Sequence, residues 1–295
     1  TMQKRYDAGE VITAMITPFD KDLKVDFNKV EKLAKHLSDN GSDAVLVVGT
    51  TGESPTLTHE EELDILRAVN NALRGTSTKI IMNTGSNSTL TAVEMSKKVE
   101  KTGMADALLS VVPYYNKPSQ EGLINHFSMI ADSTSLPIIL YNIPGRTGIN
   151  MLPDTIAKLV EKNKNISGVK QSCADLDLVS EIRIKTPDDF AIYSGDDSLT
   201  LPMLALGADG VISVASHIIG KEIKEMISSF KSGNYQKALE LHKKYFDVFK
   251  KLFIAPNPTP VKAVLAAKGL IEEFVRPPLC PVTDSQRDLL KKLDI

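Results

Sequence analysis

Short apolar runs alternate with longer amphipathic segments over most of the chain. Eight runs rich in Val, Ile and Leu are each followed by polar, Gly or Pro residues, at 11–16, 44–48, 80–83, 107–112, 138–141, 166–170, 191–194 and 210–214. Runs of this length and composition predict buried strands of a parallel sheet. Between the strands, apolar residues recur at helical spacing in the segments 27–37, 60–73, 91–101, 122–133 and 153–161. The pattern therefore predicts eight successive β/α units.

Several of the predicted helices follow a residue that is suited to capping them. Asp26, Thr58, Ser119 and Asp154 each stand at or near such a start. A side-chain oxygen at this position can accept hydrogen bonds from the first N–H groups of the helix, which have no partner inside it. The caps and the periodicity thus support the same segmentation.

Eight β/α units in a chain of 295 residues favour a closed barrel, because closure leaves no sheet edge exposed. An open, doubly wound sheet is the alternative, although no Gly-x-Gly-x-x-Gly follows the first strand, as its dinucleotide-binding version requires. Helical patterns at 219–230, 235–252, 261–268 and 285–293 follow the eighth strand. We therefore expect an α/β fold with a (β/α)8 barrel core at 1–216, then the last barrel helix and a C-terminal helical appendage at 217–295.

Charge and composition narrow the class of partner. The 35 basic and 37 acidic residues give a net charge of −2, and no basic block with interleaved aromatics occurs, so we expect no nucleic-acid partner. No apolar stretch approaches the roughly 20 residues that span a bilayer, and charged residues precede the first apolar run, so we expect no membrane association and a cytoplasmic protein. Cys173 and Cys280 could pair, but free thiols fit such a protein better. The five histidines are scattered, which argues against a metal site.

Lys170 is the most informative single residue. It ends the predicted sixth strand, Ile-Ser-Gly-Val-Lys, in a fold whose active sites lie where strands end. Lysine is almost never buried in a helix-covered parallel sheet unless it is paired, so an inward side chain needs an explanation. A salt bridge or a side chain that reaches out to solvent is one explanation. The other is a Schiff base, because burial away from carboxylates favours the neutral amine that attacks a carbonyl.

Other strand ends carry small polar residues and tyrosines. The second strand continues into Gly-Thr-Thr-Gly-Glu-Ser at 49–54, whose amides and hydroxyls could hold a carboxylate, or which could simply form a tight turn. Tyr114 and Tyr115 follow the fourth strand, and Tyr141 ends the fifth, where each could be catalytic or a packing residue. Asp196 and Asp197 follow the seventh strand, where capping of the next helix is favoured over cation binding.

These residues resemble the dihydrodipicolinate synthase and N-acetylneuraminate lyase family of class I aldolases, over essentially the whole chain. The resemblance rests on six segments in family order: Gly49-Thr50-Thr51-Gly52-Glu53, Tyr114-Tyr115-Asn116, Tyr141-Asn142-Ile143-Pro144, Gly168-Val169-Lys170, Ser194-Gly195-Asp196-Asp197 and Pro256-Asn257-Pro258.

The resemblance implies roles for the strand-end residues. Lys170 would form an imine with pyruvate, which tautomerises to an enamine that attacks an aldehyde. Tyr141 would transfer protons, with Thr51 and Tyr115 completing the relay, and Tyr115 would reach in from a neighbouring subunit. The remaining implied residues form the substrate pocket: the Thr50 and Thr51 amides would hold the pyruvate carboxylate, and Gly195 and Ile212 would line the same pocket.

Arg146 selects a branch within the family. With the double threonine it favours dihydrodipicolinate synthases, because a guanidinium can clamp the second carboxylate of L-aspartate 4-semialdehyde. Tethering of its own loop is the other explanation for this arginine. The resemblance then implies a lyase that condenses pyruvate with this aldehyde to 4-hydroxy-tetrahydrodipicolinate, the first committed step of lysine and diaminopimelate biosynthesis. It also implies no dissociable cofactor and a homotetramer of paired dimers, although some members are dimers.

The chain departs from the family pattern at several positions. Gln171 follows the lysine where an acidic residue is common. Some relatives have a lysine effector pocket, of which this chain keeps Ser54, His59, Asn87 and Tyr114. Because Glu62 replaces a second histidine and Thr91 replaces a glutamate, we expect weak or absent feedback by lysine.

Two rival functions remain at the sequence level. A sister aldolase would share Lys170 and Tyr141 but act on a sugar-derived keto acid, and Arg146 argues against it. A keto-acid sensor would keep the pocket without catalysis, but binding alone would not need the proton relay.

Overall fold

The computed structural model describes residues 3–295, in which eight parallel strands form a closed barrel in the order β1 to β8. The strands are β1 Val11–Ala14, β2 Ala44–Val47, β3 Lys79–Asn83, β4 Ala107–Val111, β5 Ile138–Asn142, β6 Ile166–Gln171, β7 Ala191–Ser194 and β8 Gly210–Ser213. Each overlaps one predicted run. The predicted barrel is therefore confirmed, and the open sheet is excluded.

The helices in chain order are α1 Phe27–Asp39, α2 His59–Leu73, α3 Thr89–Thr102, α4 Gln120–Asp132, α5 Pro144–Thr147, α6 Pro153–Lys162, α7 Leu176–Lys185, α8 Thr200–Ala205, α9 Ser216–Lys231, α10 Tyr235–Lys251, α11 Thr259–Ala267 and α12 Asp284–Leu290. Two short 3-10 helices, η1 Ser54–Thr56 and η2 Asp197–Leu199, follow β2 and β7. The chain divides into two compact units: unit 1 contains residues 3–9 with Ile81–Ile212, and unit 2 contains Glu10–Ile80 with Ser213–Ile295.

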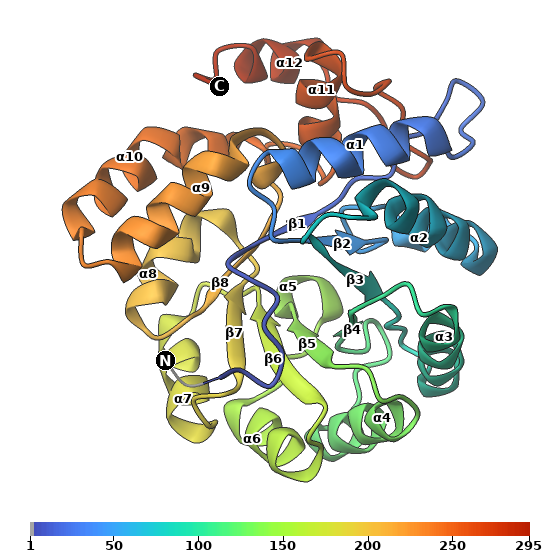
Figure 1. The fold of residues 1–295 in the computed structure, drawn as a ribbon, viewed down its shortest axis with the longest axis vertical. Coiled ribbons are helices and arrows are strands. Elements are labelled where there is room, and N and C mark those ends of the chain that lie inside the picture. The colour runs from blue at the N-terminus through green and yellow to red at the C-terminus, as the bar shows by residue number, and fades with distance from the viewer. Residues whose placement is uncertain (1–2) are drawn as a thin grey trace. The chain divides into compact units, whose positions relative to one another are not determined.

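Unit 1 contains Lys170 and the three tyrosines predicted at strand ends, Tyr114, Tyr115 and Tyr141. Neighbouring strands β4 to β8 are parallel, and Tyr141 of β5 stands in register with Lys170 of β6, which stands in register with Tyr193 of β7. Helices α4 and α6 pack together outside these strands, as Figure 1 shows, and α6 also contacts α7. Ser119 accepts a hydrogen bond from the N–H of Gly122 and so caps α4, as predicted.

Unit 2 contains the first two strands and the C-terminal helices. Helices α1 and α2 pack against each other, and so do α9 and α10, as Figure 1 shows. Asp26 caps α1, and Thr58 forms a capping box with α2, which confirms both predicted caps. Gly41, with a φ of 101°, lies against α9: a Cβ there would come 2.8 Å from the carbonyl carbon of Gly220, so the approach requires glycine.

Several sequence expectations need correction or stay open. Asp154 does not cap α6: that helix starts after Leu152 with Pro153 in its first turn, so Asp154 lies inside the first turn and pairs with Lys185. The short α5 and the weakly amphipathic α7 were not predicted. The predicted division into a barrel core at 1–216 and an appendage at 217–295 stays a prediction. Residues 1 and 2 of that core lie outside the described part of the chain.

No helix within residues 3–295 is long and apolar enough to cross a membrane. Cys173 and Cys280 are both free.

Candidate active site

Lys170 is buried at the end of β6. All six residues of this strand are buried, and Lys170 has 7% of its surface exposed. Its Nζ lies 3.9 Å from the centre of the Tyr141 ring, on the neighbouring strand. Within residues 3–295 the Lys170 side chain forms no ion pair, so neither a salt bridge nor escape to solvent explains this lysine. The structure thus leaves a buried amine beside a phenol.

Gly195 makes room for the lysine side chain. Its N–H donates to the carbonyl of Gln171, which holds the end of β7 beside the end of β6. A Cβ on Gly195 would lie 3.0 Å from Cε of Lys170 and 1.8 Å from Oγ of Ser172. Any larger residue would therefore displace both side chains. The structure brings Gly195 to Lys170, and it adds Ser172, which the sequence reasoning missed.

Gln171 lies on the opposite side of the strand from Lys170, since successive side chains alternate. It is 1% exposed, and its Oε1 accepts a hydrogen bond of 3.1 Å from Nδ2 of Asn142 on β5. Asn142 also accepts from the N–H of Met151, so it ties β5, β6 and the loop after α5 together. Gln171 therefore has a structural partner, and an acidic residue at this position could accept the same hydrogen bond.

The loop after β4 presents two exposed tyrosines. Tyr115 is 89% exposed, with a φ of 77°, and its N–H donates to the carbonyl of Thr147. Tyr114 is 42% exposed, and its carbonyl accepts from Nδ2 of Asn87. A positive φ is uncommon for a tyrosine, so the loop holds Tyr115 in an unusual orientation that directs it to solvent in the isolated chain.

Arg146 lies exposed in α5, and its guanidinium forms no hydrogen bond or ion pair with any residue between 3 and 295. The loop is held instead by Thr147, whose hydroxyl donates to the carbonyls of Ile143 and Ile149. The arginine is thus not needed to tether its own loop. Its five N–H donors remain available for a ligand. Ile212, the remaining predicted pocket residue of unit 1, is buried on β8.

In unit 2, the turn after β2 leaves two successive amides unused. The N–H groups of Gly52, Glu53 and Ser54 donate to carbonyls within the turn. Those of Thr50 and Thr51 donate to no acceptor in the described part of the chain. Two adjacent free amides make a concave donor site for a carboxylate, so the turn has the geometry that anion binding requires.

The hydroxyl of Thr51 has a defined partner in the same unit. Thr51 is 4% exposed, and its Oγ1 accepts a hydrogen bond of 2.9 Å from Nδ2 of Asn257. On the other side of the turn, Thr17 donates to the carbonyl of Gly52. The turn is therefore fixed by side chains from distant parts of the sequence.

The residues proposed for an effector pocket belong to both units. In unit 1, Asn87 and Tyr114 are joined by the hydrogen bond already described. In unit 2, Ser54 donates to Oε1 of Glu62 at 3.0 Å, and His59 is exposed at the start of α2. Burial raises the pKa of Glu62 to about 7, and the hydrogen bond from Ser54 opposes that shift.

Of the two acidic residues after β7, Asp196 caps the next helical segment, η2. Oδ1 of Asp196 accepts hydrogen bonds from the N–H and the hydroxyl of Ser198, which confirms the predicted cap. Asp197 is 2% exposed. Among residues 3–295, no three His, Cys, Asp or Glu side chains lie close enough together to hold a metal ion.

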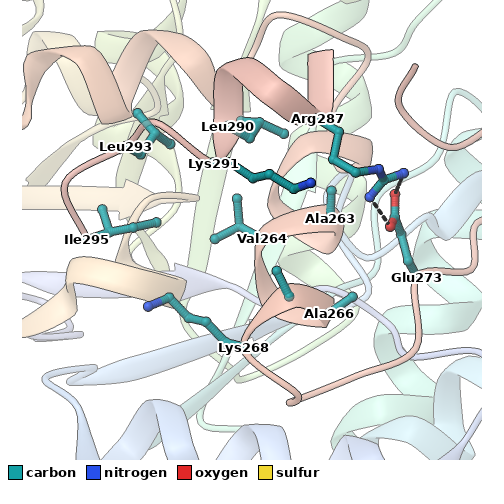
Figure 2. Close-up of a pocket in the computed structure, with 11 residues that line it drawn as sticks. Ala263, Val264, Ala266, Lys268, Glu273, Arg287, Leu290, Lys291, Leu293 and Ile295 are labelled. Atoms are coloured by element: carbon teal, nitrogen blue, oxygen red, sulfur yellow. Dashed lines mark hydrogen bonds and ion pairs between the residues drawn. The ribbon is translucent and has the colours of Figure 1, made fainter. Parts of the chain in front are cut away.

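A cavity of about 490 Å³ lies elsewhere in unit 2, against α11 and α12. Figure 2 shows Val264, Leu290 and Leu293 on its wall and the Glu273–Arg287 ion pair at its edge. None of the predicted catalytic or substrate-binding residues is among those that line it. We do not assign it to the reaction.

Comparison with known proteins gives one consistent result. Residues 7–293 match the model of the dihydrodipicolinate synthetase family. The 4-hydroxy-tetrahydrodipicolinate synthase of Desulforamulus reducens is 51% identical over 287 residues, which cover 97% of this chain and 96% of that protein.

Solved structures agree. Dihydrodipicolinate synthase from Cyanidioschyzon merolae with lysine bound has a TM-score of 0.95 and 49% identity, covering 97% of each chain. Dihydrodipicolinate synthase DapA-2 from Bacillus anthracis has a TM-score of 0.94 and 48% identity, again covering 97% of each chain. A family match along nearly the whole chain and close structural likeness lead to the same conclusion: the chain belongs to the dihydrodipicolinate synthetase family.

Proposed function

We propose that Lys170 is the imine-forming residue of a class I aldolase that condenses pyruvate with L-aspartate 4-semialdehyde. The product is 4-hydroxy-tetrahydrodipicolinate, so the enzyme is a lyase that begins the biosynthesis of lysine and diaminopimelate. The observation that carries the assignment is the buried amine at the end of β6, which has no ion-pair partner in the described part of the chain and lies beside the Tyr141 ring. Such an amine can attack a carbonyl without first breaking a salt bridge.

The chemistry follows from an imine at Lys170. Its Nζ adds to the keto carbon of pyruvate, water leaves, and the protonated imine then draws electrons from the methyl group, which loses a proton to give an enamine. The enamine carbon attacks the aldehyde of the second substrate, whose amino group then displaces Lys170 and closes the ring. The lysine itself supplies the electron sink, so the reaction needs no dissociable cofactor.

Proton transfer is assigned to Tyr141, Thr51 and Tyr115. Tyr141 is buried beside the amine, which supports its role at the reacting carbon and nitrogen. The fixed hydroxyl of Thr51 supports a role in a relay that needs defined hydrogen-bond directions. The exposure of Tyr115 supports a role in the active site of a neighbouring subunit. We propose a homo-oligomer on this basis, a tetramer of paired dimers by family resemblance.

Substrate recognition is assigned to residues with unused donors. The free amides of Thr50 and Thr51 support binding of the pyruvate carboxylate. The unpaired Arg146 supports a clamp on the carboxylate of the aldehyde substrate. Gly195 and Ile212 would line the pyruvate pocket. Weak or absent feedback by lysine through Ser54, His59, Asn87 and Tyr114, like the cytoplasmic location, stays a prediction.

Borohydride reduction of the protein in the presence of pyruvate tests the assignment. Peptide mass spectrometry should find a pyruvyl adduct on Lys170 and none on Lys262, a second buried lysine that is ion-paired with Glu53 and so serves as an internal control. The variant Lys170→Met should lose the adduct. An adduct on any other lysine, or none at all, would overturn the imine assignment.

A panel of aldehydes in a coupled assay then identifies the branch. Arg146→Met should raise the KM for aspartate semialdehyde about tenfold or more, because a charge-assisted contact is lost, and should leave the pyruvyl adduct intact. Turnover with a sugar-derived partner instead would favour the sister aldolase. An adduct without turnover of any aldehyde would favour a sensor.

A further inference from the structure

Ser172 carries a buried hydroxyl beside the imine lysine. Its Oγ is inaccessible to solvent and has no hydrogen-bond partner among residues 3–295. The same hydroxyl and Cε of Lys170 lie 1.8 Å and 3.0 Å from the point that a Cβ on Gly195 would occupy. The hydroxyl and the lysine side chain are therefore neighbours against the backbone of one glycine.

The position of Ser172 follows from β6. The side chain two residues after Lys170 returns to the same face of the strand, while Gln171 points to the other face. The N–H of Ser172 donates to the carbonyl of Asn142 at 2.9 Å, so the backbone stays attached to β5 beyond the end of β6. This attachment places the hydroxyl on the side of the sheet where Lys170 and Tyr141 lie.

A buried hydroxyl without a hydrogen-bond partner costs free energy, so its position beside a reactive amine needs an explanation. A ligand that binds at the amine could supply the missing hydrogen bond. The hydroxyl does not bond to the amine of Lys170 itself. Its hydrogen and its lone pairs are therefore both free for a group that Lys170 binds. The keto oxygen of pyruvate is such a group. It is bonded to the carbon that the amine attacks, and it gains negative charge as the amine adds.

We propose that Ser172 is a further catalytic residue, which carries a proton during the first step of imine formation; this inference rests on the function proposed for Lys170. As the bond between Nζ and the keto carbon forms, the π bond of the carbonyl breaks and its electron pair moves to oxygen. Oγ of Ser172 takes one hydrogen from Nζ and gives its own hydrogen to that oxygen. The product is the neutral carbinolamine, and the serine is regenerated.

The test is the rate at which the pyruvyl adduct forms. Purified protein is mixed with pyruvate and quenched with borohydride at increasing times. Intact mass spectrometry then measures the fraction of protein that carries the pyruvyl adduct at each time. Ser172→Ala should slow adduct formation on the order of tenfold to a hundredfold, as expected when a positioned proton carrier is lost. The final fraction of adduct at saturating pyruvate should match the wild type, because a catalyst changes the rate and not the equilibrium.

Ser110→Ala is the matched control. Ser110 is also a buried serine whose hydroxyl has no partner in the described chain. It stands in register with Leu140 of β5, one residue away from Tyr141, so its side chain points to the other face of the sheet. Its loss should leave the rate of adduct formation within about twofold of the wild type, since it carries no proton in the reaction.

The outcomes separate this inference from the function on which it rests. Without an adduct in the wild type, the function assigned to Lys170 fails. If the wild type forms the adduct and Ser172→Ala forms it equally fast, only the role of Ser172 fails. The role of Ser172 also fails if the variant raises the KM for aspartate semialdehyde without slowing the adduct, or if Ser110→Ala slows the adduct as much.

Discussion

Lys170 and Lys262 are both buried but differ in their charged partners. Lys262 has no exposed surface, and its Nζ lies 2.5 Å from Oε2 of Glu53 and 2.8 Å from the carbonyl of Phe274. Burial lowers its pKa to about 8, against the opposing charge of Glu53. Both lysines lie over an aromatic ring, Lys170 over Tyr141 and Lys262 over Phe19, but Lys170 pairs with no carboxylate among residues 3–295. The ion-pair partner of a buried lysine, more than its burial, therefore separates Lys262 from Lys170, the nucleophile that we propose.

Glu62 gives a prediction at the residue scale. Burial raises its folded pKa to about 7 from a usual value of 4.5. The folded state therefore binds the proton more tightly, and the carboxyl costs stability as pH rises from about 4.5 through 7. Glu62→Gln should be more stable than the wild type at pH 8, by up to about 3 kcal/mol, and nearly equal to it at pH 4.5.

Urea unfolding at both pH values and one protein concentration measures this difference. Glu60→Gln is the control, because Glu60 is exposed in the same helical turn and its removal should produce no comparable change with pH. A stability gap for Glu62→Gln that is the same at pH 4.5 and pH 8 would contradict the prediction.

At the element scale, the C-terminal helical segment supports the turn after β2 within unit 2. Asn257 holds the hydroxyl of Thr51, and Lys262 of α11 holds the carboxylate of Glu53. Glu53 has a φ of 59°, which is unfavourable for a residue with a side chain, and the N–H of Arg276 also donates to its Oε1. The helices added after the barrel strands thus help to fix a loop that we assign to substrate binding.

Lys262→Met tests this support. The substitution leaves Glu53 buried without its counter-charge, so the free energy of unfolding should fall by about 3–5 kcal/mol. The double variant Glu53→Gln with Lys262→Met should recover much of the loss, because no unpaired charge remains. Denaturant unfolding of the two single variants and the double variant measures the coupling. Additive losses would show that the two side chains do not act as a pair.

At the scale of the whole molecule, the exposed Tyr115 predicts that activity depends on assembly. If Tyr115 serves the site of a partner, then Lys170→Met and Tyr115→Phe damage different sites in a mixed dimer, and one site of the two stays intact. Co-expressing the two nearly inactive variants should therefore restore about a quarter of wild-type activity, since about half of the randomly paired dimers are mixed.

The control for this experiment is the activity of each variant alone at the same protein concentration. Sedimentation measures the size of the assemblies in the same samples. Activity of the mixture no greater than the sum of the separate variants, in samples that contain mixed dimers, would place Tyr115 in the site of its own chain or outside the reaction.

Much of the fold could be predicted from the sequence because its signals are local. The eight apolar runs became the eight strands, and the caps at Asp26, Thr58 and Ser119 formed as expected. The predicted cap at Asp154 was wrong, because α6 begins with Pro153 after Leu152 and has no side-chain cap. Lys170 could be singled out because a charged residue at the end of a buried strand is conspicuous in the sequence itself.

What only the tertiary structure decided depends on residues that are far apart in the chain. The folded backbone brings Oγ of Ser172 close to Gly195 and forms the hydrogen bond between Asn142 and Gln171. It also brings Asn257 and Lys262 to the turn at 49–53, which they support. Hydrophobic periodicity reports which face of an element is buried, so it determined the barrel. It does not report which polar atoms meet on that face, because hydrogen bonds require distances and directions that arise only when the strands lie side by side.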